Sequence, residues 1–233
     1  MKKSIRLAIC ILVAVIGLVC IGISVSKLCK SRLSEKKNEK FSREELDWKE
    51  MKDTNEHIYA WIYVPKTNID YPILQHPTID SFYLEHDLEG ESNPQGCIYS
   101  EPTYNETDFE AFHTVLYGHN MANGSMFHTL HNYQEETFFE ENRYFYIYTP
   151  EGNLKYEIFA AYVNSDEHLL HDFPLEEEMQ RQAYIKYALE VAKETGFVRD
   201  NIIPTPESHI ITLSTCIGDD FSQRYLVQGV LTK

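Results

Sequence analysis

The feature that most constrains the fold is a series of short runs rich in aromatic and β-branched residues, which fills the chain from His57 onward. Turn-forming residues separate the runs, and segments of this length and composition favour β-strands. About eight such runs predict a mainly β structure whose sheet closes, or nearly closes, into a barrel. The predicted strands are residues 59–64, 71–74, 97–100, 114–117, 144–149, 154–163, 209–214 and 224–231.

Two helices are expected beside the strands. The first lies near Arg43–Asn55, because Ser42 and Glu45 have the spacing of a capping box. The second lies within residues 174–196, where acidic residues crowd the first turn and Gly196 follows as a C-terminal cap. The apolar positions expected to face the core recur at helical spacing and are Met179, Ala183, Tyr184, Tyr187, Ala188 and Val191.

The N-terminus contains an apolar segment, Leu7–Val25, of 19 residues without a charge. As a helix rising about 1.5 Å per residue it spans about 28 Å, close to the hydrocarbon thickness of a bilayer. A cleaved signal peptide is the alternative, but its apolar region is usually shorter and the sequence matches a cleavage site only loosely. We therefore expect a membrane anchor over residues 1–26, a basic linker over 27–40 and a separate domain over 41–233.

Charge is divided at the same place. Residues 1–40 carry nine basic and two acidic residues, whereas the remainder carries 12 basic and 34 acidic residues, a net charge of −22. A domain this acidic lacks the cationic surface that nucleic acids require, which excludes them as partners. The basic linker suits anionic lipid headgroups. Basic residues lie on both sides of the apolar segment, so charge alone leaves its orientation in the membrane open.

Cys216 is the candidate nucleophile. Only Cys97 and Cys216 lie in the acidic part of the chain, which is too few for a disulfide scaffold. Strand alternation places Cys216 at the end of the more polar face of its strand. Arg224 begins the next strand after a short connection, so the guanidinium is expected within a few ångströms of the thiol. An arginine there lowers the thiol pKa and can donate to a developing oxyanion.

A cysteine nucleophile also needs a group that protonates the leaving amine. Of the ten histidines, His119 is the best candidate, because it follows a predicted strand and leads into a turn. His113 begins the same strand and is expected to be structural or exposed. Two histidine pairs, 128/131 and 168/171, have an i,i+3 spacing that suits a metal but lack a clear ligand set. We therefore expect no metal and no other cofactor.

Three motifs together resemble the sortases, specifically class B. They are TLSTC at residues 212–216, an arginine eight residues later, and YGHNM at residues 117–121. The similarity covers most of residues 41–233 and includes segments 59–75 and 82–101 and the long helix between the sixth and seventh strands. It implies an eight-stranded sortase-type β-barrel, preceded by an N-terminal helix and a single transmembrane helix. It also implies a cytoplasmic N-terminus and a catalytic domain outside a Gram-positive cell.

The resemblance also implies roles for single residues. Cys216 matches the nucleophile, His119 the catalytic histidine and Arg224 the catalytic arginine. Residues 164–173 match the wall of the substrate groove, and here His168 and Leu169 replace an aromatic-aliphatic pair found in some relatives. Asp80 similarly replaces an asparagine, so substrate preference stays open. The positions expected to contact the sorting peptide are Leu84, Leu169, Ser214 and Thr215.

The expected function is that of a cysteine transpeptidase of the thiol-peptidase type. It cleaves a C-terminal sorting signal after threonine and joins the surface protein, through a thioacyl-enzyme, to an amine of a peptidoglycan precursor. Two alternatives remain: a cysteine endopeptidase that acts mainly by hydrolysis, and a non-enzymatic surface-binding module on the same barrel. The expected partners are sorting-signal peptides and the acceptor amine, and the catalytic domain is expected to be monomeric.

Overall fold

The structure, a computed structural model, describes residues 46–218 and 220–232. These residues belong to one compact unit, Phe41–Lys233. The apolar segment Leu7–Val25 and the basic linker lie outside the described residues. Within the described part, no helix combines the length and apolar character needed to cross a membrane.

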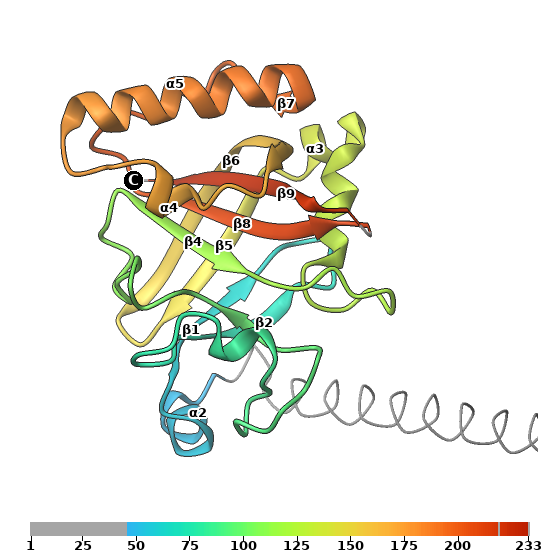
Figure 1. The fold of residues 1–233 in the computed structure, drawn as a ribbon, viewed down its shortest axis with the longest axis vertical. Coiled ribbons are helices and arrows are strands. Elements are labelled where there is room, and N and C mark those ends of the chain that lie inside the picture. Colours follow the sequence, from blue (N-terminus) through green and yellow to red (C-terminus); the bar gives the residue numbers. More distant parts are fainter. Residues whose placement is uncertain (1–45, 219, 233) are drawn as a thin grey trace, which may run out of the picture. The chain divides into compact units, whose positions relative to one another are not determined.

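The described strands form a closed β-barrel (Figure 1). Their order is β5-β1-β2-β3-β4-β8-β9-β6-β7, and a further pairing of β5 with β6 closes eight strands into a ring. The prediction of a mainly β, eight-stranded barrel is therefore confirmed. The strands are Ile58–Tyr63 (β1), Asp70–Leu74 (β2), Ile98–Tyr99 (β3), His113–Tyr117 (β4), Tyr144–Thr149 (β5), Gly152–Ser165 (β6), Gly196–Val198 (β7), Ile210–Ile217 (β8) and Asp220–Leu231 (β9).

Strand alternation separates two apolar layers. Ile211 and Leu213 of β8 belong to one buried cluster with Phe145 and Tyr156 of the facing strands. Ile210, which points to the opposite face, belongs to a second cluster that includes residues of helix α5. Because successive side chains of a strand point to opposite faces, one layer fills the barrel and the other lies between the barrel and the helix.

Helix α5, Glu178–Thr195, covers the outer face of the barrel near β6 and β7 (Figure 1). Its buried residues are Tyr184, Ile185, Ala188 and Ala192. The predicted apolar stripe was therefore wrong at Met179, which is 76% exposed, and at Ala183. Successive residues of a helix are rotated by about 100°, which places Met179 and Ala183 on the side of α5 opposite the buried residues. Ile185 and Ala192 pack against the barrel instead.

Gly196 follows α5, as predicted, but close packing rather than a left-handed turn explains the glycine. Its φ of −171° is extended, and it is the first residue of β7. A Cβ at this position would collide with the carbonyl oxygen of Ala161 on β6. The short β7 strand was not predicted; it pairs with β6 outside the closed ring.

The first described helix, α2, is Trp48–Thr54, shorter than the predicted Arg43–Asn55. Asp47 has extended backbone angles, and its carboxylate accepts hydrogen bonds from the backbone N–H groups of Lys49 and Glu50. Asp47 therefore caps this helix; the predicted cap, Ser42, lies outside the described residues. The remaining helices are η2 (Phe82–Leu84), η3 (His128–Gln134), α3 (Glu136–Glu141) and α4 (Leu169–Asp172).

Candidate active site

Strands β8 and β9 place the candidate cysteine and arginine opposite each other. They pair antiparallel, and the Cα of Cys216 is the partner of the Cα of Arg224. The prediction that the short connection brings these two residues together is therefore confirmed at the backbone. The ladder becomes irregular between Cys216 and Ile217, so Cys216 forms the last regular pair at this end of β8.

Strand β4 brings the candidate histidine to the same end of the sheet. It runs parallel to β8 with Tyr117 opposite Ser214, and the backbone N–H of Gly118 then donates to the Ser214 carbonyl at 3.2 Å. A Cβ on Gly118 would collide with the side chains of Ile98 and Phe127, so the packing of these two side chains against the backbone favours glycine here. His119 follows directly and leaves the sheet beside the end of β8.

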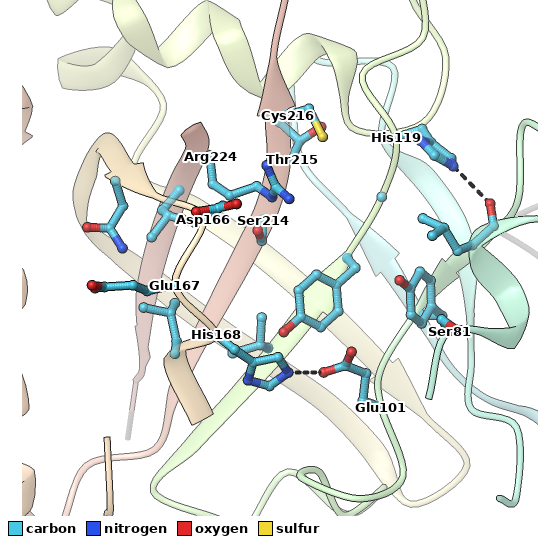
Figure 2. Close-up of a pocket in the computed structure, with 18 of the residues that line it drawn as sticks. Ser81, Glu101, His119, Asp166, Glu167, His168, Ser214, Thr215, Cys216 and Arg224 are labelled. Atoms are coloured by element: carbon cyan, nitrogen blue, oxygen red, sulfur yellow. Dashed lines mark hydrogen bonds and ion pairs between the residues drawn. The ribbon is translucent and has the colours of Figure 1, made fainter. Parts of the chain in front are cut away.

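A cavity of about 290 Å³ opens over this end of the sheet. The three candidate catalytic side chains line it together (Figure 2). Cys216 is half-buried, whereas Ser214 and Thr215 beside it are buried. All seven residues that the sequence assigned to the site line this one cavity: Leu84, His119, Leu169, Ser214, Thr215, Cys216 and Arg224.

His119 is held by a backbone group. Its Nε2 lies 2.8 Å from the carbonyl oxygen of Leu84, and Figure 2 shows the ring turned toward this contact. A carbonyl only accepts hydrogen bonds, so Nε2 carries the proton that is donated. Leu84 was predicted to contact the peptide through its side chain; the structure shows that its backbone carbonyl also orients His119. This role of the backbone had no signal in the sequence.

Arg224 lies on the cavity side of β9. Its side chain is partly exposed, and its Nη1 donates to the Gln223 carbonyl at 3.0 Å. Figure 2 shows the guanidinium close to Ser214 and Cys216, on the side of β8 that faces the cavity. The planar group has five N–H donors, so it can bind more than one acceptor at once.

A polar pair forms part of the cavity wall opposite the cysteine, where the sequence predicted His168 but not its partner Glu101. Nε2 of His168 lies 2.7 Å from Oε2 of Glu101, and the two side chains are largely buried. The Tyr104 ring packs against His168 with ring centroids 4.4 Å apart. Glu101 is far from His168 in the sequence, so only the fold brings this pair together.

The floor of the cavity contains two stacked tyrosines, Tyr99 and Tyr117, with ring centroids 5.5 Å apart. Burial raises the pKa of both phenols, and the nearby Glu101 carboxylate raises them further. Both hydroxyls therefore stay neutral over the physiological range. The floor offers flat apolar surface rather than charge.

Two other sequence predictions concern groups outside this chemistry. Asp80, which replaces an asparagine of some relatives, accepts a hydrogen bond from the backbone N–H of Thr103 at 3.0 Å and does not line the cavity. The histidine pairs that suggested a metal do not assemble a ligand set: among residues 46–218 and 220–232, no group of three or more metal-binding side chains is found.

Comparison with known proteins identifies the family. The sortase domain family model matches residues 62–232. Sortase B of Listeria monocytogenes is 31% identical over 191 residues, which cover 81% of this chain and 74% of the relative. The Clostridium perfringens sortase B structure has a TM-score of 0.70 and 30% identity, covering 80% of this chain and all of that chain.

A Streptococcus pyogenes class B sortase involved in pilus biogenesis is also similar. Its structure has a TM-score of 0.66 and 28% identity, and the match covers 80% of this chain and 98% of that chain. The family match, the relatives and the shared barrel agree with the Cys216, His119 and Arg224 geometry described above. The chain therefore belongs to the sortase family, and within it to the class B sortases.

Proposed function

We propose that Cys216, His119 and Arg224 carry out the reaction that membership of class B implies, in which a cysteine transpeptidase anchors proteins to the cell wall. The substrate is a C-terminal sorting signal, which is cleaved after threonine. The observation that carries the proposal is that Cys216 pairs with Arg224 at the mouth of a cavity that His119 also lines. A purely structural cysteine would have no need of this arrangement.

In the first half of the reaction, the Cys216 thiolate attacks the carbonyl carbon of the threonine. The carbonyl oxygen becomes an oxyanion, which the Arg224 guanidinium stabilises by donating hydrogen bonds. The carbon–nitrogen bond then breaks, and the departing amine takes a proton from His119. The products are a thioacyl-enzyme and the free C-terminal fragment.

In the second half, an amine of a peptidoglycan precursor attacks the thioacyl carbon. His119 takes the proton that the amine loses, and the Cys216 thiolate leaves as the new amide bond forms. Because Leu84 accepts from Nε2 of His119, we assign the proton transfers to Nδ1 of the same ring. In this arrangement Nε2 fixes the orientation of the ring, while Nδ1 transfers the protons.

The Glu101–His168 pair also lines the cavity in which we expect the peptide to bind. Leu84, Leu169, Ser214 and Thr215 are our candidates for contact with the peptide. Ser214 and Thr215 are nearly inaccessible, at 5% and 2% exposed, whereas Leu84 is 37% exposed. We therefore expect Leu84 to contribute the largest side-chain surface of the four.

Hydrolysis is the alternative fate of the thioacyl-enzyme, and a product assay separates the two. A sorting peptide is incubated with the soluble domain, with and without an added amine, and the products are identified by mass. A transpeptidase makes the peptide–amine conjugate at the expense of the free acid. A free acid alone, at every amine concentration, would identify an endopeptidase, and no cleavage of any sorting peptide would leave a binding module.

We further infer that residues 1–26 anchor the protein in the membrane, with the N-terminus inside and residues 41–233 outside the cell. The uncharged segment Leu7–Val25 supports the anchor, and the extracytoplasmic reaction supports the orientation. Protease added to intact, wall-stripped cells should digest the domain. Complete protection of the domain in these cells, but not in lysed cells, would contradict the orientation.

A further inference from the structure

The backbone carbonyl of Cys216 has no strand partner on the β4 side. The Ser214 carbonyl points toward β4 and accepts from Gly118. Two residues further, the Cys216 carbonyl points the same way, because strand geometry repeats every second residue. β4 has already ended at Tyr117, and His119 begins the loop that leaves the sheet. A buried or half-buried carbonyl in this position needs another donor.

Two side chains supply the missing donors. Nδ2 of Asn120 lies 3.1 Å from the Cys216 carbonyl oxygen, and Nε2 of His131 lies 3.1 Å from the same oxygen. Asn120 comes from the loop after β4, whereas His131 belongs to the helix η3, so two separate segments converge on the nucleophile. Neither side chain is among the residues that line the cavity.

Each of the two donors is oriented by a further side chain. Nδ1 of His128 lies 2.7 Å from Oδ1 of Asn120, which fixes the amide with its NH₂ group toward Cys216. Nε2 of Gln134 lies 3.2 Å from Nδ1 of His131. Because the Cys216 carbonyl only accepts, His131 donates through Nε2 and accepts from Gln134 through Nδ1. Each donor therefore faces an acceptor in both series of hydrogen bonds, from His128 through Asn120 and from Gln134 through His131 to the Cys216 carbonyl.

The surroundings of His131 favour the neutral ring that this scheme requires. Its ring stacks on Tyr225 of β9, with centroids 5.2 Å apart and planes 29° apart. Burial lowers its pKa, the bond to Cys216 works in the opposite direction, and the neighbouring His128 lowers it further. A neutral His131 keeps Nδ1 free to accept from Gln134.

We propose that Asn120 and His131 are positioning residues that hold the peptide unit of Cys216, and so fix where the thiol lies relative to Arg224. The inference rests on the proposed role of Cys216 as the nucleophile. The site needs such support because the β8–β9 ladder becomes irregular directly after Cys216 and β4 has ended on the other side. In the sequence, His131 stood out only as part of an i,i+3 histidine pair that lacked a clear set of metal ligands.

Two substitutions of His131 separate the hydrogen bond from the packing. His131→Phe keeps a ring to stack on Tyr225 but has no donor, whereas His131→Gln loses the ring but can donate through its amide. Loss of one hydrogen bond worth about 1 kcal/mol corresponds to roughly five- to tenfold in rate. We expect His131→Phe to lower kcat by about this factor with KM nearly unchanged, and His131→Gln to recover most of it.

A matched control lies at the other end of the same strand. His209, just before β8, also contacts a backbone carbonyl, with its Nδ1 3.2 Å from the Ala111 oxygen. His209→Phe therefore removes the same kind of contact far from the thiol and should leave kcat unchanged. Asn120→Ala should lower kcat as His131→Phe does. Thermal unfolding of each variant shows that the comparison is made between folded proteins.

The rate of Cys216 alkylation by iodoacetamide tests the inference without any substrate. It should fall in His131→Phe and Asn120→Ala, recover in His131→Gln and stay unchanged in His209→Phe. Wild-type kcat and alkylation in folded His131→Phe would overturn the inference, as would an equal loss in the Phe and Gln variants. If the wild-type enzyme cleaved no sorting peptide, the proposed function would fail, and alkylation would still decide the positioning role.

Discussion

Each end of the parallel pair β4–β8 contains a histidine, and the two histidines lie in opposite environments. At one end, Nε2 of His113 lies 2.7 Å from the Thr212 hydroxyl, and Gln228 and Tyr184 complete a fully buried polar cluster under α5. At the other end, His119 lies at the edge of an open cavity. Six positions in one segment therefore separate a sealed histidine from an accessible one.

Burial decides what each histidine can do. Burial lowers the pKa of His113 to about 3, so this ring stays neutral and acts only as a hydrogen-bonding part of the core. His119 lines the cavity and has one nitrogen held by a backbone carbonyl, so its other nitrogen can exchange protons with a bound molecule. Accessibility, rather than residue type, distinguishes the functional end of the sheet from the structural end.

The largest effect that tests this comparison is the loss of the thiol at the open end. Cys216→Ala should abolish cleavage of a sorting peptide, a loss on the order of 10⁴-fold or more, because no other group can form the thioacyl bond. Cys97→Ala is the matched control: Cys97 is only 3% exposed, and burial raises the pKa of its thiol, so the rate should hardly change. A folded Cys216→Ala enzyme with wild-type turnover would end the proposed mechanism.

The next largest effect is expected from the comparison of His119 with His113. His119→Ala should lower kcat by about 10² to 10⁴, the usual contribution of a general acid and base. His113→Gln should leave kcat within the same order but lower the midpoint of thermal unfolding, because it disturbs the buried cluster with Thr212. Steady-state kinetics and a melting curve for each variant test both statements. The reverse pattern would show that the open and sealed ends had been assigned the wrong roles.

Arg224 tests whether geometry or charge matters at the open end. Lysine keeps the positive charge but loses the planar group that binds two acceptors. If Arg224 donates to the oxyanion, Arg224→Lys should cost about 10² to 10³ in kcat/KM. The thiol pKa is measured in the same variant by alkylation against pH. Near-wild-type turnover in Arg224→Lys would reduce its role to the electrostatic effect on the thiol.

The smallest effect is the pH dependence of stability from the sealed end. An unfolded histidine has a pKa near 6.5, whereas folded His113 has a pKa of about 3. Between these values the unfolded chain binds the extra proton, so the free energy of unfolding falls as the pH falls, by at most about 1.4 kcal/mol per pH unit. Above pH 6.5 this residue contributes no slope.

Urea unfolding of wild type and His113→Gln over a range from about pH 4 to pH 7 measures that slope. The variant should lose less stability per pH unit on acidification, even if it is less stable at neutral pH. The difference between the two slopes isolates His113, because every other residue is the same in both proteins. Equal slopes in the two proteins would show that protonation of His113 does not cause the loss of stability at low pH.

The strands were predictable from the sequence because their composition is a local property. All eight predicted runs overlap strands of the barrel, and the three candidate catalytic residues line one cavity. His119 was predicted from its place between a strand and a turn and from the resemblance to the sortases, because β4 and β8 pair across nearly a hundred residues and no local spacing links His119 to Cys216. The same separation explains why the Glu101–His168 contact could not be predicted: His168 was expected in the groove wall, but nothing local in the sequence links it to Glu101.

The predictions that were wrong concern packing between elements. The sequence of α5 offers apolar residues on more than one side, and the barrel surface selects the side with Ile185 and Ala192 rather than Met179. Asp47 replaces the expected start of the first helix because its carboxylate binds two backbone N–H groups. The short β7 strand exists because Gly196 fits against β6.

The parallel pairing of β4 with β8 also sets the order in which activity can arise during folding. β4 can pair with β8 only after the segment between them has been made, and Arg224 lies on β9, the last strand of the barrel. A chain whose last strand has not yet been made therefore carries no assembled cysteine–arginine pair. Contacts between residues this distant in sequence form slowly. The three catalytic candidates therefore come together only when the barrel closes, so turnover can be used to measure complete folding.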